Sequence, residues 1–218
     1  MTDERTIRND VARMARMMAR AGLAEAFGHV SARFEDGYAI TSVKPFLAAG
    51  PDDVIMVPDL RTPPSGTGTA SLEVPMHAAV YLARPDVQAI CRGHSPAVAA
   101  WGVGTDDLPL LHGLGALAGR HVAVHDDVEL ITSLARAGGL VETLADDHCV
   151  ILRSNGALAV GTALSEALTR LYYLEERARV ALQRPDGGGP LNWGNRLDNT
   201  AKELPRTVAW MEATFGDG

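Results

Sequence analysis

Short amphipathic and apolar segments alternate along most of the chain, with glycine and proline between them. Residues 7–20 carry apolar side chains at positions i, i+4, i+7 and i+11, which is the period of an amphipathic helix. Residues 29–33 and 38–41 are strand-like, and the acidic turn between them ends at Gly37, which predicts an antiparallel hairpin. A chain built from such short, mixed elements is expected to fold as an α/β protein.

The same alternation continues to residue 182. Residues 127–145 have a helical apolar period that Gly138 and Gly139 interrupt, which predicts either one broken helix or two. Residues 61–70 are rich in Pro, Gly, Ser and Thr and predict a surface loop. The other expected helices cover residues 75–83, 95–101 and 166–182, and the other expected strands cover residues 87–91, 149–152 and 157–160.

Glycine and proline dominate residues 184–190, and the sequence beyond them is largely polar. The chain contains neither internal repeats nor a clear linker. We therefore expect one domain over residues 1–190 and a C-terminal arm over residues 191–218. Apolar anchors for this arm are Trp193, Leu204 and Trp210.

The net charge of −7 and the scattered arginines argue against two classes of partner. Nucleic acids and membrane surfaces both require a concentrated basic face, which this sequence lacks. No apolar run approaches the roughly 18 to 20 residues of a membrane helix, and the first residues lack the apolar core of a signal peptide. The prediction is a cytoplasmic protein, in which Cys91 and Cys149 are buried, reduced thiols rather than a disulfide.

Glu73 and His77 lie four residues apart on an expected helix, and His94 follows an expected strand. Acidic and imidazole side chains at such spacings serve as metal ligands or acid–base catalysts, although a structural pair is the more frequent outcome. Four further histidines lie among Gly or Asp residues, in expected loops or strand ends, and most of them are expected to be solvated or to cap backbone groups: His112, His121, His125 and His148. Spacing alone names no reaction.

Several short segments follow one another in a distinctive order. They are residues 27–33 (FGHVSAR), 38–41 (YAIT), 71–77 (SLEVPMH), 81–87 (YLARPDV), 93–96 (GHSP) and 155–161 (NGALAVG). Each is short, but their order and distances together resemble the class II aldolase/adducin family over roughly residues 7 to 182. The resemblance implies a three-layer α/β/α domain around a largely antiparallel central sheet. It also implies a homotetramer with the active site between neighbouring subunits.

Metal-dependent members of this family bind a divalent ion, commonly zinc, through two histidines of a His-x-His-Ser-Pro segment and a third before the Gly of the late hairpin. The cation stabilises an enediolate, and a glutamate at the position of Glu73 moves a proton. Here His94 matches the second histidine, but Arg92 and Asn155 occupy the other two positions. Arginine has no lone pair to offer, and an amide oxygen is a poor zinc ligand. We therefore expect no cofactor, with a zinc, manganese or iron ion on Glu73 and His94 as the alternative.

Arg92 favours a rebuilt active site, because a fixed guanidinium binds a carboxylate or stabilises an enolate without an ion. We expect Glu73 to carry the proton and His94 to orient or share it. His29 is either a proton donor or a contact that holds the hairpin. The predicted activity is that of a lyase, aldolase- or decarboxylase-like, that cleaves a carbon–carbon bond through an enolate-type intermediate.

Phosphate-binding members of the family carry Gly-Asn at the first hairpin and paired serines or threonines before the glutamate. Here the first segment is Gly28-His29 and only Ser71 remains, which favours a small hydroxy or keto acid or an aromatic acid over a sugar phosphate. Gly-His is similar to the adducin branch and to members that decarboxylate aromatic or heteroaromatic acids. Lys44 is expected to be a surface lysine or a contact to a substrate anion, with a Schiff-base role as the alternative. The expected substrate-binding residues are Ser31, Lys44, Ser71 and Asn155.

Two other functions remain open. A dehydratase or isomerase on the same fold uses the same enolate chemistry, and a non-catalytic adducin-like scaffold uses none. A scaffold is expected to have an extended charged or coiled tail, whereas this chain has only the arm of residues 191–218. We expect that arm to close over a neighbouring subunit's site or to stabilise the oligomer, with an exposed tail as the alternative. The expected partners are a small-molecule substrate and further copies of this chain.

Overall fold

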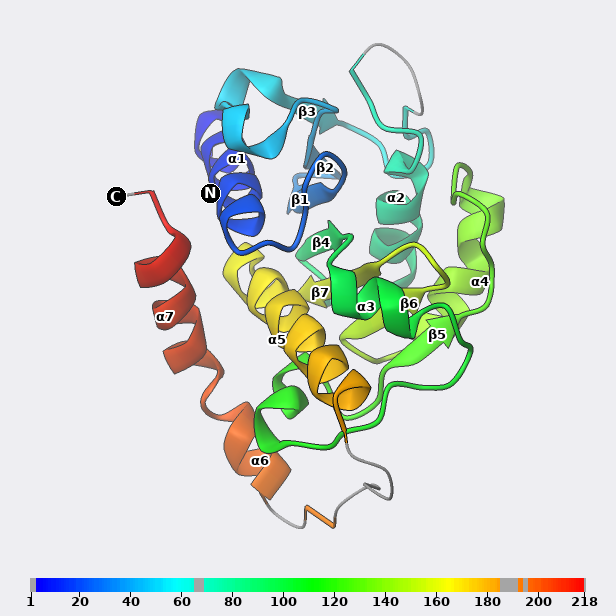
Figure 1. Ribbon diagram of the computed structural model, residues 1–218. Coiled ribbons are helices and arrows are strands. Elements are labelled where there is room, and N and C mark those ends of the chain that lie inside the picture. The colour runs from blue at the N-terminus through cyan, green and yellow to red at the C-terminus, as the bar shows by residue number, and fades with distance from the viewer. Residues whose placement is uncertain (1–2, 65–68, 185–191, 194–195, 218) are drawn as a thin grey trace.

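A mixed sheet of seven strands runs through the molecule in the order β3-β2-β1-β4-β7-β6-β5 (Figure 1). The computed structural model describes residues 3–64, 69–184, 192–193 and 196–217. Neighbouring strands are antiparallel, except that β5 and β6 are parallel. The strands are β1 (His29–Phe34), β2 (Gly37–Thr41), β3 (Val54–Val57), β4 (Ala89–Gly93), β5 (Ala123–His125), β6 (Cys149–Leu152) and β7 (Ala157–Gly161).

Helices cover both faces of this sheet (Figure 1). One hydrophobic core lies between the sheet and α1 (Glu4–Arg20), α3 (Pro96–Trp101) and α5 (Leu164–Leu182). The other lies between the sheet and α2 (Val74–Ala83) and α4 (Leu134–Leu144). The remaining described helices are α6 (Arg196–Ala201), α7 (Leu204–Phe215) and the 3₁₀ helices η1 (Phe46–Ala48), η2 (Pro51–Asp53) and η3 (Gly113–Ala118). The predicted three-layer α/β/α fold around a largely antiparallel sheet is confirmed.

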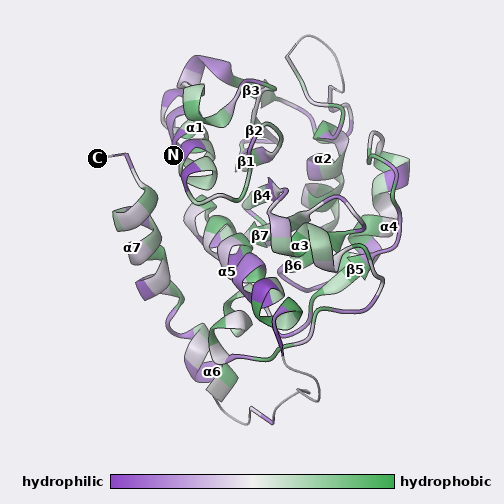
Figure 2. Ribbon diagram, viewed as in Figure 1, coloured by the Kyte–Doolittle hydropathy of each residue, from purple (hydrophilic) through white to green (hydrophobic). Residues whose placement is uncertain are grey.

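The alternation of side chains along each strand separates the two cores. In β4, Ala89 and Cys91 belong to the core on the α1 and α5 side, and Ile90 belongs to the core on the α2 and α4 side. Because side chains alternate with a period of two, Arg92 faces the α2 side together with Ile90. Figure 2 shows that hydrophilic and hydrophobic residues are mixed along both α1 and α5, as expected of helices that bury one face and expose the other.

Both predicted hairpins are present, as β1–β2 and β6–β7. Residues 127–145 differ from the prediction, because Ser133 caps a single helix, α4, which continues through Gly138 and Gly139. The prediction of one broken helix or two is therefore wrong. A Cβ at Gly139 would come within 3.2 Å of the His125 ring, so this glycine allows α4 to approach β5 closely rather than breaking the helix.

The sequence did not predict β3 and β5, which have four and three residues and form the two edges of the sheet. Strands this short show too little alternation to produce a recognisable pattern. His125 is the last residue of β5 and is buried beside Thr143, so it is an exception to the expectation that most of the four further histidines are solvated or cap backbone groups. Cys91 and Cys149 are buried and unpaired, as predicted. Among the described helices, none is long and apolar enough to cross a bilayer.

The described residues of the C-terminal arm pack on their own chain. Helix α7 lies against α1 and α5 (Figure 1), and its Met211 is buried. Glu212 pairs with Arg13, and Asp217 pairs with Arg16. The part of the arm that we expected to reach a neighbouring subunit is thus a helix on the surface of its own domain. The predicted boundary at residues 190–191 and residues 65–68 of the predicted loop lie outside the described residues.

His121 connects two exposed segments through its imidazole ring. Its Nδ1 lies 2.7 Å from a carboxylate oxygen of Asp147, and its Nε2 lies 2.8 Å from one of Asp107. These hydrogen bonds, to Asp147 and to Asp107, raise the pKa of His121 above its ordinary value. Protonated His121 therefore stabilises the folded protein through these two carboxylates. This contribution to the free energy of unfolding is fully present below the ordinary pKa of about 6.5 and is lost as the pH rises through the raised value.

We expect His121→Gln to lower the midpoint of thermal unfolding at about pH 6 and to have little effect at about pH 9. Scanning calorimetry of the wild-type protein and the variant at both pH values measures the difference. An effect of equal size at the two pH values would contradict this prediction.

Candidate active site

A cavity of about 490 Å³ lies where the start of β1 and the end of β4 meet the start of α2. A smaller cavity of about 100 Å³ adjoins it and also reaches Lys44. The two cavities share Phe27, His29, Val43 and Ser71. The larger cavity is lined in addition by Ala70, Leu72, Glu73, His94, Leu130 and Asn155. The cavity therefore combines apolar walls with a group of polar side chains.

Three elements bring the polar residues together. The antiparallel register of β1 and β4 places His29 opposite Arg92. Glu73 immediately precedes α2, and His94 immediately follows β4. The fold thus gathers, at the ends of the central strands β1 and β4, the four residues that the sequence indicated as catalytic.

The turn between β6 and β7 brings Asn155 to the same place. Ser154 and Gly156 have positive φ angles of 55° and 79°, and Asn155, between them, lines the larger cavity. A Cβ at Gly156 would overlap the carbonyl oxygen of Gly93, so this position requires glycine. The close contact holds the turn against the end of β4.

Arg92 forms a buried ion pair directly behind this cavity. Its side chain is fully enclosed, and Nη2 lies 3.5 Å from Oε2 of Glu73, which lines the cavity. Nη1 donates a hydrogen bond of 2.7 Å to the carbonyl oxygen of Gly93, whereas Nε and Nη2 have no hydrogen-bond partner among the described residues. Burial lowers the pKa of Arg92 to about 10, against the opposing effect of Glu73, so the guanidinium remains charged at neutral pH.

The histidines of the cavity are neutral at physiological pH. Burial, together with the charge of Arg92, lowers the pKa of His94 to about 4. Burial lowers the pKa of His29 well below its ordinary value, and the neighbouring His77, Arg92 and His94 lower it further. Arg92 does not line the cavity, but its field acts on both histidines that do. Arg92 is thus a permanent positive charge behind the floor of the cavity.

His77, whose role the sequence left open, belongs to a buried row behind the floor. Its Nδ1 lies 2.7 Å from Oγ of Ser31, which in turn lies 2.8 Å from the hydroxyl of Tyr81. The rings of His77 and His29 meet edge to face, with 5.5 Å between their centroids. Ser31, which we expected to bind substrate, is fully buried and supports the floor from behind. The four-residue spacing of His77 and Tyr81 on α2 is the sequence signal for this row.

The remaining predicted substrate-binding residues occupy different positions. Ser71 lines both cavities, and its hydroxyl accepts a hydrogen bond of 3.2 Å from the backbone N–H of Glu73. Lys44 lines only the smaller cavity, where its Nζ lies 2.8 Å from Asp53. The Lys44 side chain is 44% exposed, so the burial on which a Schiff-base role depends is not present.

The side chains at the cavity do not fit the three-histidine metal site that the resemblance implies. Of the three positions, only His94 supplies an imidazole, and the guanidinium of Arg92 carries no lone pair. In the part of the chain that the structure describes, no three His, Cys, Asp or Glu side chains are arranged to hold a metal ion. Glu73 and His94 are two donors on their own, which is fewer than the three protein ligands of ordinary catalytic zinc sites.

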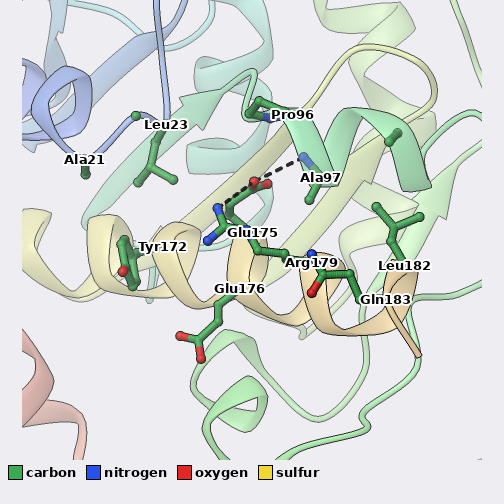
Figure 3. A pocket seen from close by; sticks show the side chains of 12 residues that line it. Ala21, Leu23, Pro96, Ala97, Tyr172, Glu175, Glu176, Arg179, Leu182 and Gln183 are labelled. Carbon is green, nitrogen blue, oxygen red and sulfur yellow. Dashed lines mark hydrogen bonds and ion pairs between the residues drawn. The ribbon is translucent and has the colours of Figure 1, made fainter. Parts of the chain in front are cut away.

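A second cavity, of about 470 Å³, lies between α3, α5 and residues 21–23 (Figure 3). Its buried carboxylate, Glu175, accepts hydrogen bonds from the backbone N–H groups of Ala97 and Val98 and pairs with Arg179. Glu175 therefore serves to cap α3. Perturbed titratable groups that converge on one cavity mark a functional site, and they converge on the cavity beside Glu73.

The solved structures identify the fold. An L-fuculose-1-phosphate aldolase from Thermus thermophilus superposes with a TM-score of 0.73 at 26% identity, over 85% of this chain and 99% of that one. The fold is that of the class II aldolases. The family described as "Class II Aldolase and Adducin N-terminal domain" matches residues 9–182, and this chain belongs to that family.

Two curated relatives indicate the range of the family. A 3,4-dihydroxyphthalate decarboxylase from Arthrobacter keyseri is 26% identical over 91% of this chain and 86% of that protein. Human beta-adducin is 29% identical over 65% of this chain, but the match covers only 20% of beta-adducin. The aldolases and decarboxylases among these relatives are lyases, and the chain is an enzyme of this aldolase- and decarboxylase-like lyase class.

Proposed function

We propose that this lyase decarboxylates a small aromatic or heteroaromatic hydroxy acid, and that Arg92 takes the place of the divalent ion of metal-dependent family members. The observation that carries the proposal is the buried pair of Arg92 and Glu73 behind the cavity that His94 lines. A permanent cation in surroundings of low dielectric constant attracts a substrate carboxylate. It also stabilises the negative charge that develops as the bond breaks.

The walls of the cavity suit a flat ring. Phe27, Leu72 and Leu130 supply apolar surface, and a volume of about 490 Å³ is ordinary for a small-molecule site. The adjoining smaller cavity, with Lys44 in its wall, offers a second positive group. This pair of cavities supports a substrate with two acidic groups, as in the diacid named for the relative from Arthrobacter keyseri.

The proposed reaction begins when Glu73 takes the proton of a ring hydroxyl and delivers it to the neighbouring ring carbon, which carries the carboxylate. The bond to the carboxylate carbon then breaks, carbon dioxide leaves, and the electron pair restores the aromatic ring as a phenolate. The charge of Arg92 stabilises this phenolate, and a proton from water completes the product. His94 and His29, both neutral, orient the substrate through hydrogen bonds.

Aldol cleavage of a sugar phosphate is the second candidate, because Ser71 and Lys44 at the smaller cavity also suit a phosphate group. Dehydration or isomerisation would use the same enolate chemistry. A scaffold without activity, similar to adducin, would turn over no substrate. The choice among these functions depends on the product that is formed.

We further propose that the enzyme works in the cytoplasm as a homotetramer. Phe27, Leu72 and Leu130 at the cavity are 75%, 51% and 45% exposed, which supports a second copy covering this rim. The unpaired Cys91 and Cys149 suit a reducing compartment. Light scattering of the purified protein decides between one chain and four.

The test of the proposed reaction uses protein dialysed against a chelator, with its metal content checked by elemental analysis. A panel of hydroxylated aromatic acids that includes 3,4-dihydroxyphthalate is supplied, and carbon dioxide release is measured. We expect turnover that the chelator leaves unchanged and that added zinc, manganese or iron does not raise. Turnover only after metal addition would overturn the role of Arg92. Cleavage of L-fuculose 1-phosphate in place of decarboxylation would establish the aldolase alternative.

A further inference from the structure

A buried row of two hydroxyls and two imidazoles leads from near the C-terminal end of α2 to the wall of the cavity. It begins at Tyr81, passes through Ser31 to His77, and ends at His29. Tyr81 and His77 belong to α2, and Ser31 and His29 belong to β1. All four residues are buried, and His29 alone lines the cavity. The row therefore connects the interior of the domain with one cavity-lining side chain.

The hydrogen bonds of this row have a direction. Burial raises the pKa of Tyr81, so its hydroxyl keeps its proton. In the described part of the chain, Ser31 is the partner of that hydroxyl, at 2.8 Å. A buried O–H group requires an acceptor, so Tyr81 donates to Oγ of Ser31. Ser31 then donates its own proton across 2.7 Å to Nδ1 of His77.

This direction fixes the tautomer of His77. A neutral imidazole has one N–H group and one acceptor nitrogen, and burial lowers the pKa of His77 to about 3. Since Nδ1 accepts from Ser31, the proton of His77 is on Nε2. Nε2 of His77 and Nδ1 of His29 are both buried without a hydrogen-bond partner among the described residues. Their rings meet edge to face with 5.5 Å between centroids, and no hydrogen bond joins the two nitrogens directly. One water molecule between them would accept the proton of Nε2 of His77 and donate to Nδ1 of His29.

We propose that the row of Tyr81, Ser31 and His77 holds His29 in the Nε2–H tautomer, which makes His29 a hydrogen-bond donor to an oxygen of the bound substrate. In this arrangement Nδ1 of His29 accepts a hydrogen bond from the water that His77 orients. His29 lines the cavity while its Nδ1 is enclosed, which leaves Nε2 as the nitrogen that meets a ligand. His77 and Ser31 are positioning residues and touch no substrate. The ligand role of His29 rests on the proposed function, whereas the tautomers do not.

A second histidine in the chain provides a matched contrast. The hydroxyl of Thr143 donates a hydrogen bond of 2.8 Å to the carbonyl oxygen of Gly139, so it has no proton left for His125. Nδ1 of His125 lies 3.1 Å from the same hydroxyl and must donate to it. His125 is therefore the Nδ1–H tautomer, which is the opposite of His77, although a hydroxyl lies at Nδ1 of both His77 and His125. A single spectrum can compare the two.

The test is nitrogen NMR of the intact protein labelled with ¹⁵N-histidine, in which the shifts of the two ring nitrogens identify the tautomer. His29→Gln, His77→Gln and His125→Gln assign the signals. We expect His77 and His29 as Nε2–H and His125 as Nδ1–H in the wild-type protein. His77 as Nδ1–H, or His29 as Nδ1–H, would overturn the proposal.

Two hydroxyl deletions make the coupling visible. We expect Ser31→Ala to convert the single tautomer of His77 to a mixture and to shift the ring nitrogen signals of His29, with which the Ser31 hydroxyl makes no hydrogen bond among the described residues. Thr143→Val is the matched control and is expected to shift only His125. Signals of His29 that stay unchanged in Ser31→Ala would overturn the coupling. None of these measurements needs a substrate. The NMR result therefore tests the tautomers even if the protein does not decarboxylate any of the acids supplied.

Discussion

Replacing Arg92 with methionine is expected to reduce kcat for decarboxylation by about a hundredfold or more, because the charge that stabilises the phenolate is lost. The same change is expected to lower the free energy of unfolding by about 3–5 kcal/mol, because Glu73 is left as a buried carboxylate without a counter-charge. Carbon dioxide release measures the first effect, and urea unfolding followed by circular dichroism measures the second. Activity is compared under conditions in which the variant is folded.

The double variant Arg92→Met with Glu73→Gln separates the two effects. Neutralising the carboxylate removes the uncompensated charge, so most of the lost stability is expected to return. Turnover is expected to stay low, because neither the cation nor the proton carrier is present. Full turnover in the single Arg92→Met variant would rule out Arg92 as the stabilising charge.

The second large effect concerns Arg177 on α5, which lies on the other side of the sheet from this cavity. Its guanidinium is buried and donates hydrogen bonds to the carbonyl oxygens of Leu108, Pro109 and Gly119. Arg177→Met would leave these carbonyls without their charged donor. Each charged hydrogen bond contributes about 1.5–3 kcal/mol, and we expect a total loss of about 3–5 kcal/mol in the free energy of unfolding.

Arg179 provides the control for this experiment, because it lies two residues further along the same helix and its side chain is 59% exposed. Arg179→Met removes an exposed partner of Glu175 and is expected to cost less than about 1 kcal/mol. Urea unfolding of both variants gives the comparison. Equal losses in the two variants would show that the carbonyl contacts of Arg177 contribute little.

The sequence indicated five residues that line the larger cavity, namely His29, Ser71, Glu73, His94 and Asn155. They could be singled out because each belongs to a short segment, and the order of these segments along the chain is distinctive. The two strands that set Arg92 opposite His29 were both expected from the sequence, but their pairing and register were not. These segments could not indicate which side chains are buried behind the residues that line the cavity.

The deeper residues were missed for a physical reason. His77 and Tyr81 lie on α2, which is buried nearly all round, so its polar positions do not stand out from an apolar face. The function of Ser31 was misjudged because a serine on a strand gives no sign of whether it faces a cavity or a helix. Helix α7 was missed because its stabilising contacts are made with α1 and α5, far away in the sequence. Such long-range contacts have no local pattern.

The turn at Gly156 has an evolutionary consequence. Any side chain at this position meets the backbone of β4, whereas Asn155 beside it has an ordinary backbone and faces the cavity. The backbone geometry therefore requires glycine at position 156, whereas position 155 accepts other side chains. A lineage that preserves this fold can accordingly alter the chemistry of the site through single substitutions, such as histidine to asparagine, without moving the main chain that carries them.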